Sequence, residues 1–155
     1  AWSPDAATLY WTDTPSHAVR AWDWDAAGNT LSHERVFYAW PVKPEGWQPG
    51  MLDQPSYGGR PDGAAVDVQG NYWSAGISAG VLNTWSPTGE LLASIQLPAA
   101  RPTCPAFGGP DLKTTYLTSL RRYLPQHLLE EYPLSGGLFA IDVDVAGVPI
   151  ARFSG

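Results

Sequence analysis

One strand–turn–strand pattern occurs three times along this chain of 155 residues, and no other feature restricts its fold as strongly. Each copy joins a short run of alternating apolar and polar residues to a second such run and a turn. The alternation places apolar side chains on one face of a strand, which is the pattern of a half-buried sheet. The copies begin at TLYWTD (Thr8 to Asp13), NYWSAG (Asn71 to Gly76) and TTYLTS (Thr114 to Ser119).

Each copy also carries a glycine where a hairpin turn is expected, at Gly28, Gly89 and Gly147. An apolar lead-in strand precedes the second and third copies, at Ala64 to Val68 and at Cys104 to Gly109. A lead-in strand, two central strands and a hairpin-linked outer strand make one four-stranded antiparallel sheet. Repeated sheets of this kind are typical of a β-propeller, so the sequence predicts an all-β chain of three four-stranded blades.

The composition favours strands and offers little helix. Eight Trp and seven Tyr suit pleated, half-buried surfaces, while 15 Pro and 16 Gly divide the chain into short elements. Two segments interrupt the repeat, Trp40 to Gly59 and Leu120 to Gly136, and both are expected to be exposed connections. One helical turn is expected in the second segment, at Gln126 to Tyr132, with Pro125 near its start.

Charge and hydropathy exclude two classes of partner. The formal net charge is −6 and the nine basic residues are scattered, so no nucleic-acid partner is expected. No apolar run approaches the roughly 20 residues that span a bilayer, so no membrane partner is expected either. Cys104 is the sole cysteine, which rules out an internal disulfide framework and favours a cytoplasmic location. The opening at Ala1 suggests a processed or partial polypeptide.

Asp62, in the stretch GGRPDGAAVDVQGNYW, is the clearest candidate for chemistry. Pro-Asp-Gly is common in turns, so Asp62 is either a turn residue that caps its own loop or a functional carboxylate. The first strand of each propeller blade lines the central channel. A carboxylate at the start of that strand, between Pro61 with its fixed φ and the flexible Gly63, converges with its counterparts from other blades. Oxygen ligands of this kind suit hard cations such as calcium.

Four ordered segments extend over nearly the whole chain, LYWTDTPSHAVRAWDWD, RPDGAAVDVQGNYWSA, FGGPDLKTTYLTS and SGGLFAIDV. Together they resemble the regucalcin/senescence marker protein/gluconolactonase family. The resemblance implies a six-bladed β-propeller with a divalent metal ion in its central channel, and an enzyme that hydrolyses sugar lactones or related esters. The visible blades resemble the C-terminal half of the family, so residues 1–155 are expected to be that half of a single propeller domain.

The same resemblance implies one metal ligand in this chain and two elsewhere. The family's ligands are a Glu in the first blade, an Asn before a W-S-P-D turn and the Asp of a P-D-G motif. Asp62 matches the last, the Asn would lie just before Ala1, and the Glu belongs to the absent half. Calcium is the expected ion, ahead of zinc, manganese or iron. The ion would polarise the lactone carbonyl, and Asp62 would also accept a proton from the attacking water.

Residues at the expected channel entrance are candidates for contact with the lactone substrate. Loops that join the second and third strands of a blade open on the same face as the starts of the channel-lining strands. The candidates on these loops are His17, Arg121, Arg122 and Tyr123. Cys104, by contrast, is expected to be a small core residue at the place equivalent to Asp62, and His33 an outer-strand surface residue.

Two other functions stay open, and the incomplete propeller predicts a partner. The alternatives are a calcium-binding propeller without catalysis and a carbohydrate-binding propeller, for which Trp40 and Trp47 are the only good candidates. Half a propeller leaves two stacking faces uncovered, where Trp11, Trp22 and Trp85 are expected. Large exposed apolar patches are rarely tolerated, so the expected partner is the missing N-terminal half or a second half-propeller chain.

Overall fold

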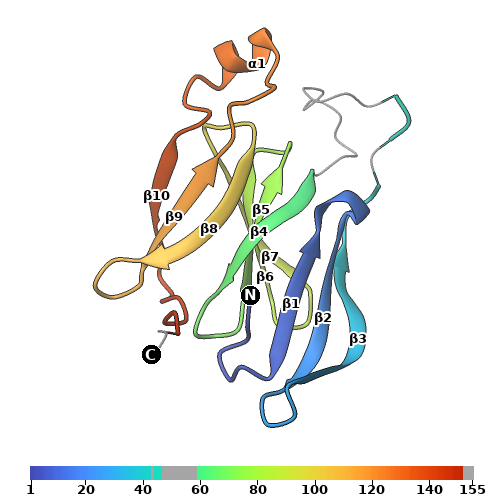
Figure 1. Ribbon diagram of the computed structural model, residues 1–155. Helices are drawn as coiled ribbons and strands as arrows, with labels where there is room; N and C mark the ends of the chain where they lie inside the picture. The colour runs from blue at the N-terminus through green and yellow to red at the C-terminus, as the bar shows by residue number, and fades with distance from the viewer. Residues whose placement is uncertain (43, 47–58, 152–155) are drawn as a thin grey trace.

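The structure, a computed structural model, describes residues 1–42, 44–46 and 59–151 (Figure 1). Within these residues the strands are β1 (Thr8–Asp13), β2 (Ala18–Asp25), β3 (Thr30–Ala39), β4 (Arg60–Val66), β5 (Tyr72–Ile77), β6 (Val81–Trp85), β7 (Leu91–Gln96), β8 (Pro102–Gly108), β9 (Thr114–Ser119) and β10 (Leu138–Asp142). The helical elements there are the 3-10 turn η1 (Thr14–Ser16) and the α-helix α1 (Gln126–Glu131). The predicted all-β chain with a helical turn near Gln126 is confirmed. None of the helices in these ranges has the length and apolar content to cross a membrane.

The strands form three antiparallel sheets. β1 to β3 make the first, β4 to β7 the second, and β8 to β10 the third. The predicted hairpins at Gly28 and Gly89 join β2 to β3 and β6 to β7. Among the described residues only the second sheet has the four strands predicted for every blade, and the other two sheets have three. At the inner edge of the first sheet, a single bridge between Trp2 and Leu9 stands where the repeat predicts a strand.

The predicted hairpin at Gly147 is wrong. Gly147 forms an isolated antiparallel bridge with Asp67, and the N–H of Val148 donates to the carbonyl of Val66 at 3.0 Å. The segment after β10 therefore pairs next to the end of β4 instead of forming an outer strand of its own sheet. A Cβ on Gly147 would overlap the Phe107 ring, so close packing, and not a turn, requires glycine at this position.

Aromatic and aliphatic side chains fill the spaces between neighbouring sheets. Tyr10, Tyr38, Tyr72 and Trp85 belong to the cluster between the first and second sheets. The rings of Tyr38 and Trp85 stack there with centroids 3.9 Å apart. A second cluster, which includes Trp73, Leu82, Phe107 and Leu117, joins the second and third sheets. The sheets are thus held by burial of apolar area between them.

The exposed position expected for Trp85 is therefore wrong. Its side chain is 6% exposed, because the aromatic face of the first sheet covers it. Trp11 is 54% exposed and packs its ring at 6.0 Å from that of the partly exposed Trp22. Alternation along β6 identifies the apolar face correctly but does not say whether a neighbouring sheet covers that face.

The connections that surround the candidate site gather at one end of the sheets, the upper end in Figure 1. η1 follows β1 at this end, and the segment that contains α1 joins β9 to β10. β4 and β8 both start here. Ala100, Leu124 and Leu128 form a small cluster that holds the α1 segment against the residues before β8.

Candidate active site

The Pro-Asp-Gly motif lies inside β4 and not in a turn before it. The register of β4 against β5 shifts between Pro61 and Ala64, so Asp62 and Gly63 together oppose the single residue Ala75. This two-against-one pairing is a β-bulge, which bends a strand and changes the direction of its side chains. The interpretation of Asp62 as a turn residue is therefore wrong, because the motif is a bulge on the innermost strand of the second sheet.

β8, the innermost strand of the third sheet, carries the same bulge. Thr103 and Cys104 together oppose Thr118 of β9. Counted along each bulge, Thr103 corresponds to Asp62 and Cys104 corresponds to Gly63. The predicted equivalence of Cys104 and Asp62 is thus wrong by one residue, and Cys104 is exposed and not part of the core.

The two bulges touch each other. A Cβ on Gly63 would lie 2.7 Å from Cys104 Sγ and 2.7 Å from the Thr103 carbonyl oxygen. Only glycine fits such an approach without movement of the neighbouring backbone. Burial, and then the charge of Asp62, raise the pKa of the Cys104 thiol. The innermost strands of two sheets therefore meet where the Asp62 carboxylate stands.

Asp62 is half-buried and incompletely stabilised by its surroundings. Thr14 of η1 donates from Oγ1 to Asp62 Oδ1 over 3.4 Å, which is a long hydrogen bond. Burial raises the pKa of the Asp62 carboxyl, and the Thr14 hydroxyl, the Arg60 charge and the Gly63 N–H offset that rise only in part. A cation at this carboxylate would supply the missing stabilisation, so the environment of Asp62 fits a metal ligand.

A complete metal site needs more donors than Asp62. Calcium takes about 6–8 oxygen ligands. In the part of the chain that the structure describes, no group of three or more His, Cys, Asp or Glu side chains is placed to hold a metal ion. The equivalent bulge of β8 presents a hydroxyl and a thiol, from Thr103 and Cys104, where β4 presents a carboxylate and a glycine. Of the four bulged residues, Asp62 alone has a charged oxygen donor.

The four residues predicted to contact substrate lie in two environments. His17 is buried after η1, with its Nδ1 at 3.2 Å from the carbonyl oxygen of Pro41. Arg121, Arg122 and Tyr123 lie on the exposed segment before α1. Tyr123 is 74% exposed, and the Arg122 guanidinium lies 4.5 Å from its ring centroid. No hydrogen bond or ion pair within the described ranges links these three residues to Asp62.

Two arginines beside the site carry a signal that neither the hairpin pattern nor the family motifs pick out. Arg60 and Arg101 each stand directly before the proline of a bulge, in the pairs Arg60-Pro61 and Arg101-Pro102. The charge of Arg60 acts on both Asp62 and Arg101. The repeated Arg-Pro pair is visible in the sequence, and alignment of the two lead-in strands on their prolines would have found it.

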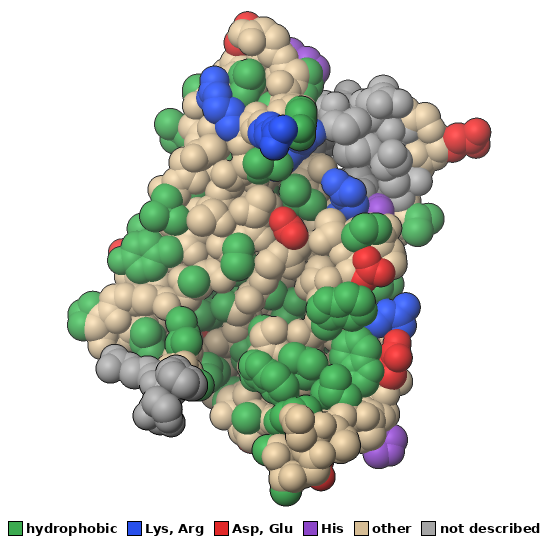
Figure 2. Space-filling model, viewed as in Figure 1, with side chains coloured by type: hydrophobic (Ala, Val, Ile, Leu, Met, Phe, Trp, Pro, Cys, Tyr) green, Lys and Arg blue, Asp and Glu red, His purple; other side chains and the backbone are tan. Residues whose placement is uncertain are grey.

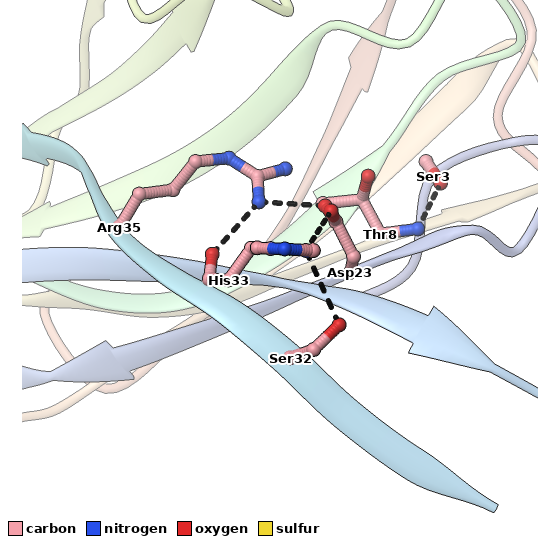
Figure 3. Close-up of polar contacts among 6 residues, drawn as sticks. All are labelled: Ser3, Thr8, Asp23, Ser32, His33 and Arg35. Atoms are coloured by element: carbon pink, nitrogen blue, oxygen red, sulfur yellow. Dashed lines mark hydrogen bonds and ion pairs between the residues drawn. The ribbon is translucent and has the colours of Figure 1, made fainter. Parts of the chain in front are cut away.

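A carboxylate–histidine pair elsewhere in the molecule resembles a catalytic pair only in composition (Figure 3). Asp23 of β2 accepts a hydrogen bond from Arg35 at 2.7 Å and lies 3.0 Å from His33 Nδ1. The Arg35 hydrogen bond holds the pKa of Asp23 below its ordinary value. The His33 side chain is 80% exposed, so the predicted surface position of His33 is confirmed. Such exposed networks contribute little to stability.

Stacked antiparallel sheets with a bulged innermost strand place the molecule in the class of β-propeller proteins. Residues 1–121 match the family model for the SMP-30/Gluconolactonase/LRE-like region, and the chain belongs to that family. The predicted family is therefore confirmed.

Curated relatives and a solved structure agree with this assignment. The chain is 41% identical to 6-deoxy-6-sulfogluconolactonase of Pseudomonas putida, over 100% of its own length and 48% of that protein. It is 31% identical to regucalcin of Xenopus laevis, over 99% of its length and 48% of that protein. The crystal structure of a calcium-binding protein, regucalcin, from Agrobacterium tumefaciens superposes with a TM-score of 0.79 at 27% identity, covering 98% of this chain and 48% of the other. The chain thus spans about half the length of the curated relatives it matches.

Proposed function

We propose that this chain carries part of the active site of a hydrolase that opens sugar lactones or related esters. One observation carries the proposal. The Asp62 carboxylate stands on a bulge of an innermost strand, half-buried, with no ion-pair partner among the described residues. The reaction class is supported by the family and by the relative named 6-deoxy-6-sulfogluconolactonase.

In this proposal Asp62 has two roles, as a metal ligand and as the general base. The carboxylate takes a proton from the water that attacks the lactone carbonyl carbon. The ring C–O bond then breaks, and the proton passes from Asp62 to the released ring oxygen to give a hydroxy acid. The Thr14 hydroxyl holds one carboxylate oxygen in place. When bound, a divalent cation supplies polarisation of the lactone carbonyl.

Calcium is the ion we propose for this site, because a carboxylate is a hard oxygen donor and suits a hard cation. The relative described as a calcium-binding protein supports this choice. Zinc, manganese and iron are the alternatives. The Arg121, Arg122 and Tyr123 side chains are exposed at the same end of the sheets as the start of β4 and are proposed to contact the substrate.

The remaining donors are proposed to come from outside this chain. The chain covers 48% of each relative reported above, so a six-bladed ring would need a further segment or a second half-propeller chain. We therefore expect little lactonase activity from the 155 residues alone, and activity from the completed propeller. Turnover of δ-gluconolactone with added calcium, zinc or manganese, by the isolated chain and by the completed protein, tests this expectation.

The role of Asp62 is tested by Asp62→Ala in the completed protein. General-base and metal-ligand functions together predict a loss of turnover of at least about a hundredfold. The circular dichroism spectrum should stay unchanged, because within the described ranges Asp62 accepts a single, long side-chain hydrogen bond. The matched control is Asp23→Ala, which removes an exposed carboxylate from an outer strand and should leave turnover intact. Wild-type turnover by Asp62→Ala would contradict the proposal.

A calcium-binding protein without catalysis is the second candidate, supported by the description of the structural relative. Titration calorimetry with calcium separates the two candidates, since this alternative predicts ion binding without lactone turnover. Carbohydrate binding is not proposed. Trp40 is partly buried and packs edge-on to Trp85 with ring centroids 5.3 Å apart, so it belongs to the packing between sheets. Trp47 lies outside the described residues.

A further inference from the structure

Arg60 and Arg101 occupy the same position in two successive repeats. Arg60 is the first residue of β4, and Arg101 directly precedes the first residue of β8. The bulges that follow them touch at Gly63 and Cys104. The repeat therefore brings two guanidinium groups to the same end of neighbouring strands, close enough for the charge of one to act on the other.

Arg101 is buried and Arg60 is partly buried. Arg101 is 9% exposed and donates from Nη1 to the carbonyl oxygen of Arg122 at 3.2 Å. The Nε atom of Arg60 is buried and has no hydrogen-bond partner in the described ranges. Neither side chain forms an ion pair with a described carboxylate. Burial, and then repulsion by Arg60, lower the pKa of the Arg101 guanidinium.

Two like charges in partly desolvated surroundings, without an ion-pair partner among the described residues, are unfavourable for folding. If Arg60 and Arg101 had a purely structural role, neutral side chains, or arginines paired with acidic residues, would fill it equally well. Asp62 offsets the charge of Arg60 only in part, since the two side chains interact electrostatically but are not at ion-pair distance. Most Lys and Arg side chains visible in Figure 2 gather toward the upper end of the molecule, whereas Asp and Glu are spread over the surface. This concentration of positive charge occurs in a chain with a net charge of −6.

An oxyanion is the ligand whose chemistry matches this arrangement. The guanidinium group presents N–H donors in a planar fork that pairs with two oxygens of a sulfonate, phosphate or carboxylate. An anion held by Arg60 and Arg101 would offset both charges and satisfy the buried Nε atom. Asp62 follows Arg60 by two residues, so such an anion would lie next to the group proposed to act on the lactone carbonyl.

We propose that Arg60 and Arg101 form a subsite for an anionic substituent of the substrate, a sulfonate or phosphate that the lactone carries away from its reacting carbonyl. This inference rests on the lactonase function proposed above for Asp62. Arg101 also fixes the subsite to the α1 segment, through its hydrogen bond to the Arg122 carbonyl.

Turnover of matched substrates by the completed protein tests the subsite. δ-Gluconolactone is the neutral substrate, and 6-phosphogluconolactone and 6-deoxy-6-sulfogluconolactone are the anionic ones. Arg60→Gln and Arg101→Gln should each raise the ratio of KM for an anionic lactone to KM for the neutral lactone by about tenfold or more. The matched control is Arg35→Gln, which removes the same charge from the outer strand β3 and should change neither KM. If Arg101→Gln does not fold, Arg101→Lys replaces it in the test, since lysine keeps the charge but lacks the planar fork of N–H donors.

Binding of inorganic sulfate and inorganic phosphate, measured by calorimetry at constant ionic strength, gives a readout that needs no turnover. Loss of anion binding in both Gln variants but not in Arg35→Gln supports the subsite. If that loss is seen and no lactone is hydrolysed, the subsite stands and only the proposed lactonase function fails. Equal binding by wild type and both Gln variants overturns the subsite. So does an unchanged preference between anionic and neutral lactones in an active enzyme, and that result leaves the lactonase function in place.

Discussion

Asp62 and Asp67 lie at opposite ends of β4, and their surroundings differ in kind. Asp67 is fully buried and accepts four hydrogen bonds of 2.9 Å, from the backbone N–H groups of Gln69 and Asn71, the Asn71 amide and the Trp73 indole. All four donors come from its own turn and the strand that follows. Asp62 is partly exposed, and the one side-chain hydrogen bond that it accepts from a described residue, at 3.4 Å, comes from Thr14 of η1, between two strands of the first sheet.

The difference separates a structural carboxylate from one that is available to a ligand. Asp67 has donors for both of its oxygens within six residues of the chain, so its charge stabilises the connection from β4 to β5. Asp62 has lost solvent without gaining equivalent donors. Burial alone does not distinguish the two roles. The supply of local donors does.

Removal of the Asp67 carboxylate should have the largest effect on stability. Asp67→Ala leaves buried donors without an acceptor, and hydrogen bonds to charged groups contribute about 1.5–3 kcal/mol each without adding fully. We expect the free energy of unfolding to fall by about 3 kcal/mol. Urea denaturation measures this, with Asp62→Ala as the control that should change much less. A loss below about 0.5 kcal/mol would make Asp67 no more structural than a surface residue.

A smaller effect is expected from pH, and it concerns Asp62. Burial raises the pKa of Asp62 above its ordinary value of 3.8, so the folded state favours the protonated carboxyl. The stabilisation is complete below pH 3.8 and is lost as pH rises through the raised pKa. Asp62→Asn cannot ionise. Wild type should therefore lose stability relative to this variant as pH rises from 3.8.

Unfolding midpoints of both proteins in urea with chelator, from acid to neutral pH, give the comparison. The chelator removes any ion that would favour the charged carboxylate. A difference between the two proteins that stays constant with pH, or that changes in the opposite direction, would show that Asp62 is as well stabilised as Asp67.

The smallest effect is expected at Asp23, although its contacts are the shortest of the three aspartates. Asp23 lies 2.7 Å from Arg35 and its side chain is half exposed. Exposed pairs gain little, because water and salt screen the charges. Asp23→Ala should leave the thermal unfolding midpoint within the scatter of replicate scans. A clear drop in the unfolding midpoint would mean that the contribution of these aspartates to stability follows hydrogen-bond length and not burial with local donors.

Patterns that act over a few residues predicted most of the fold. The alternation in TLYWTD and TTYLTS gives β1 and β9 with the observed bounds, and glycine marks the turns at Gly28 and Gly89. The hairpin prediction at Gly147 failed because glycine is required there for close packing against Phe107, forty residues earlier in the chain. The exposure predicted for Trp85 was wrong because a neighbouring sheet covers its side chain. Contacts between sheets leave no mark in the spacing of residues within a strand.

The candidate site was predictable only as far as its motif. Asp62 stands out because Pro-Asp-Gly is a compact signal that matches a family pattern. The bulge that holds it was not predictable, since a register shift depends on the partner strand β5. Arg60 and Arg101 share an Arg-Pro pair that the sequence shows, but their lack of an ion-pair partner among the described residues could not be predicted. Whether an arginine has an ion-pair partner depends on which side chains surround it in the folded protein, and the sequence alone does not give those neighbours.

The repeated bulge has a consequence for how proteins of this fold diverge. In β4 and β8 a proline before the bulge and regular ladder pairing after it fix the strand, and the bulged residue itself is outside that ladder. Asp62 and Thr103 show that one such position accepts a carboxylate and the next a hydroxyl while both sheets keep their register. Substitution at these positions can therefore change the groups presented to a ligand one at a time, without a compensating change in the sheets. A propeller can therefore change its substrate through single substitutions at bulged positions, and the protein stays folded after each of them.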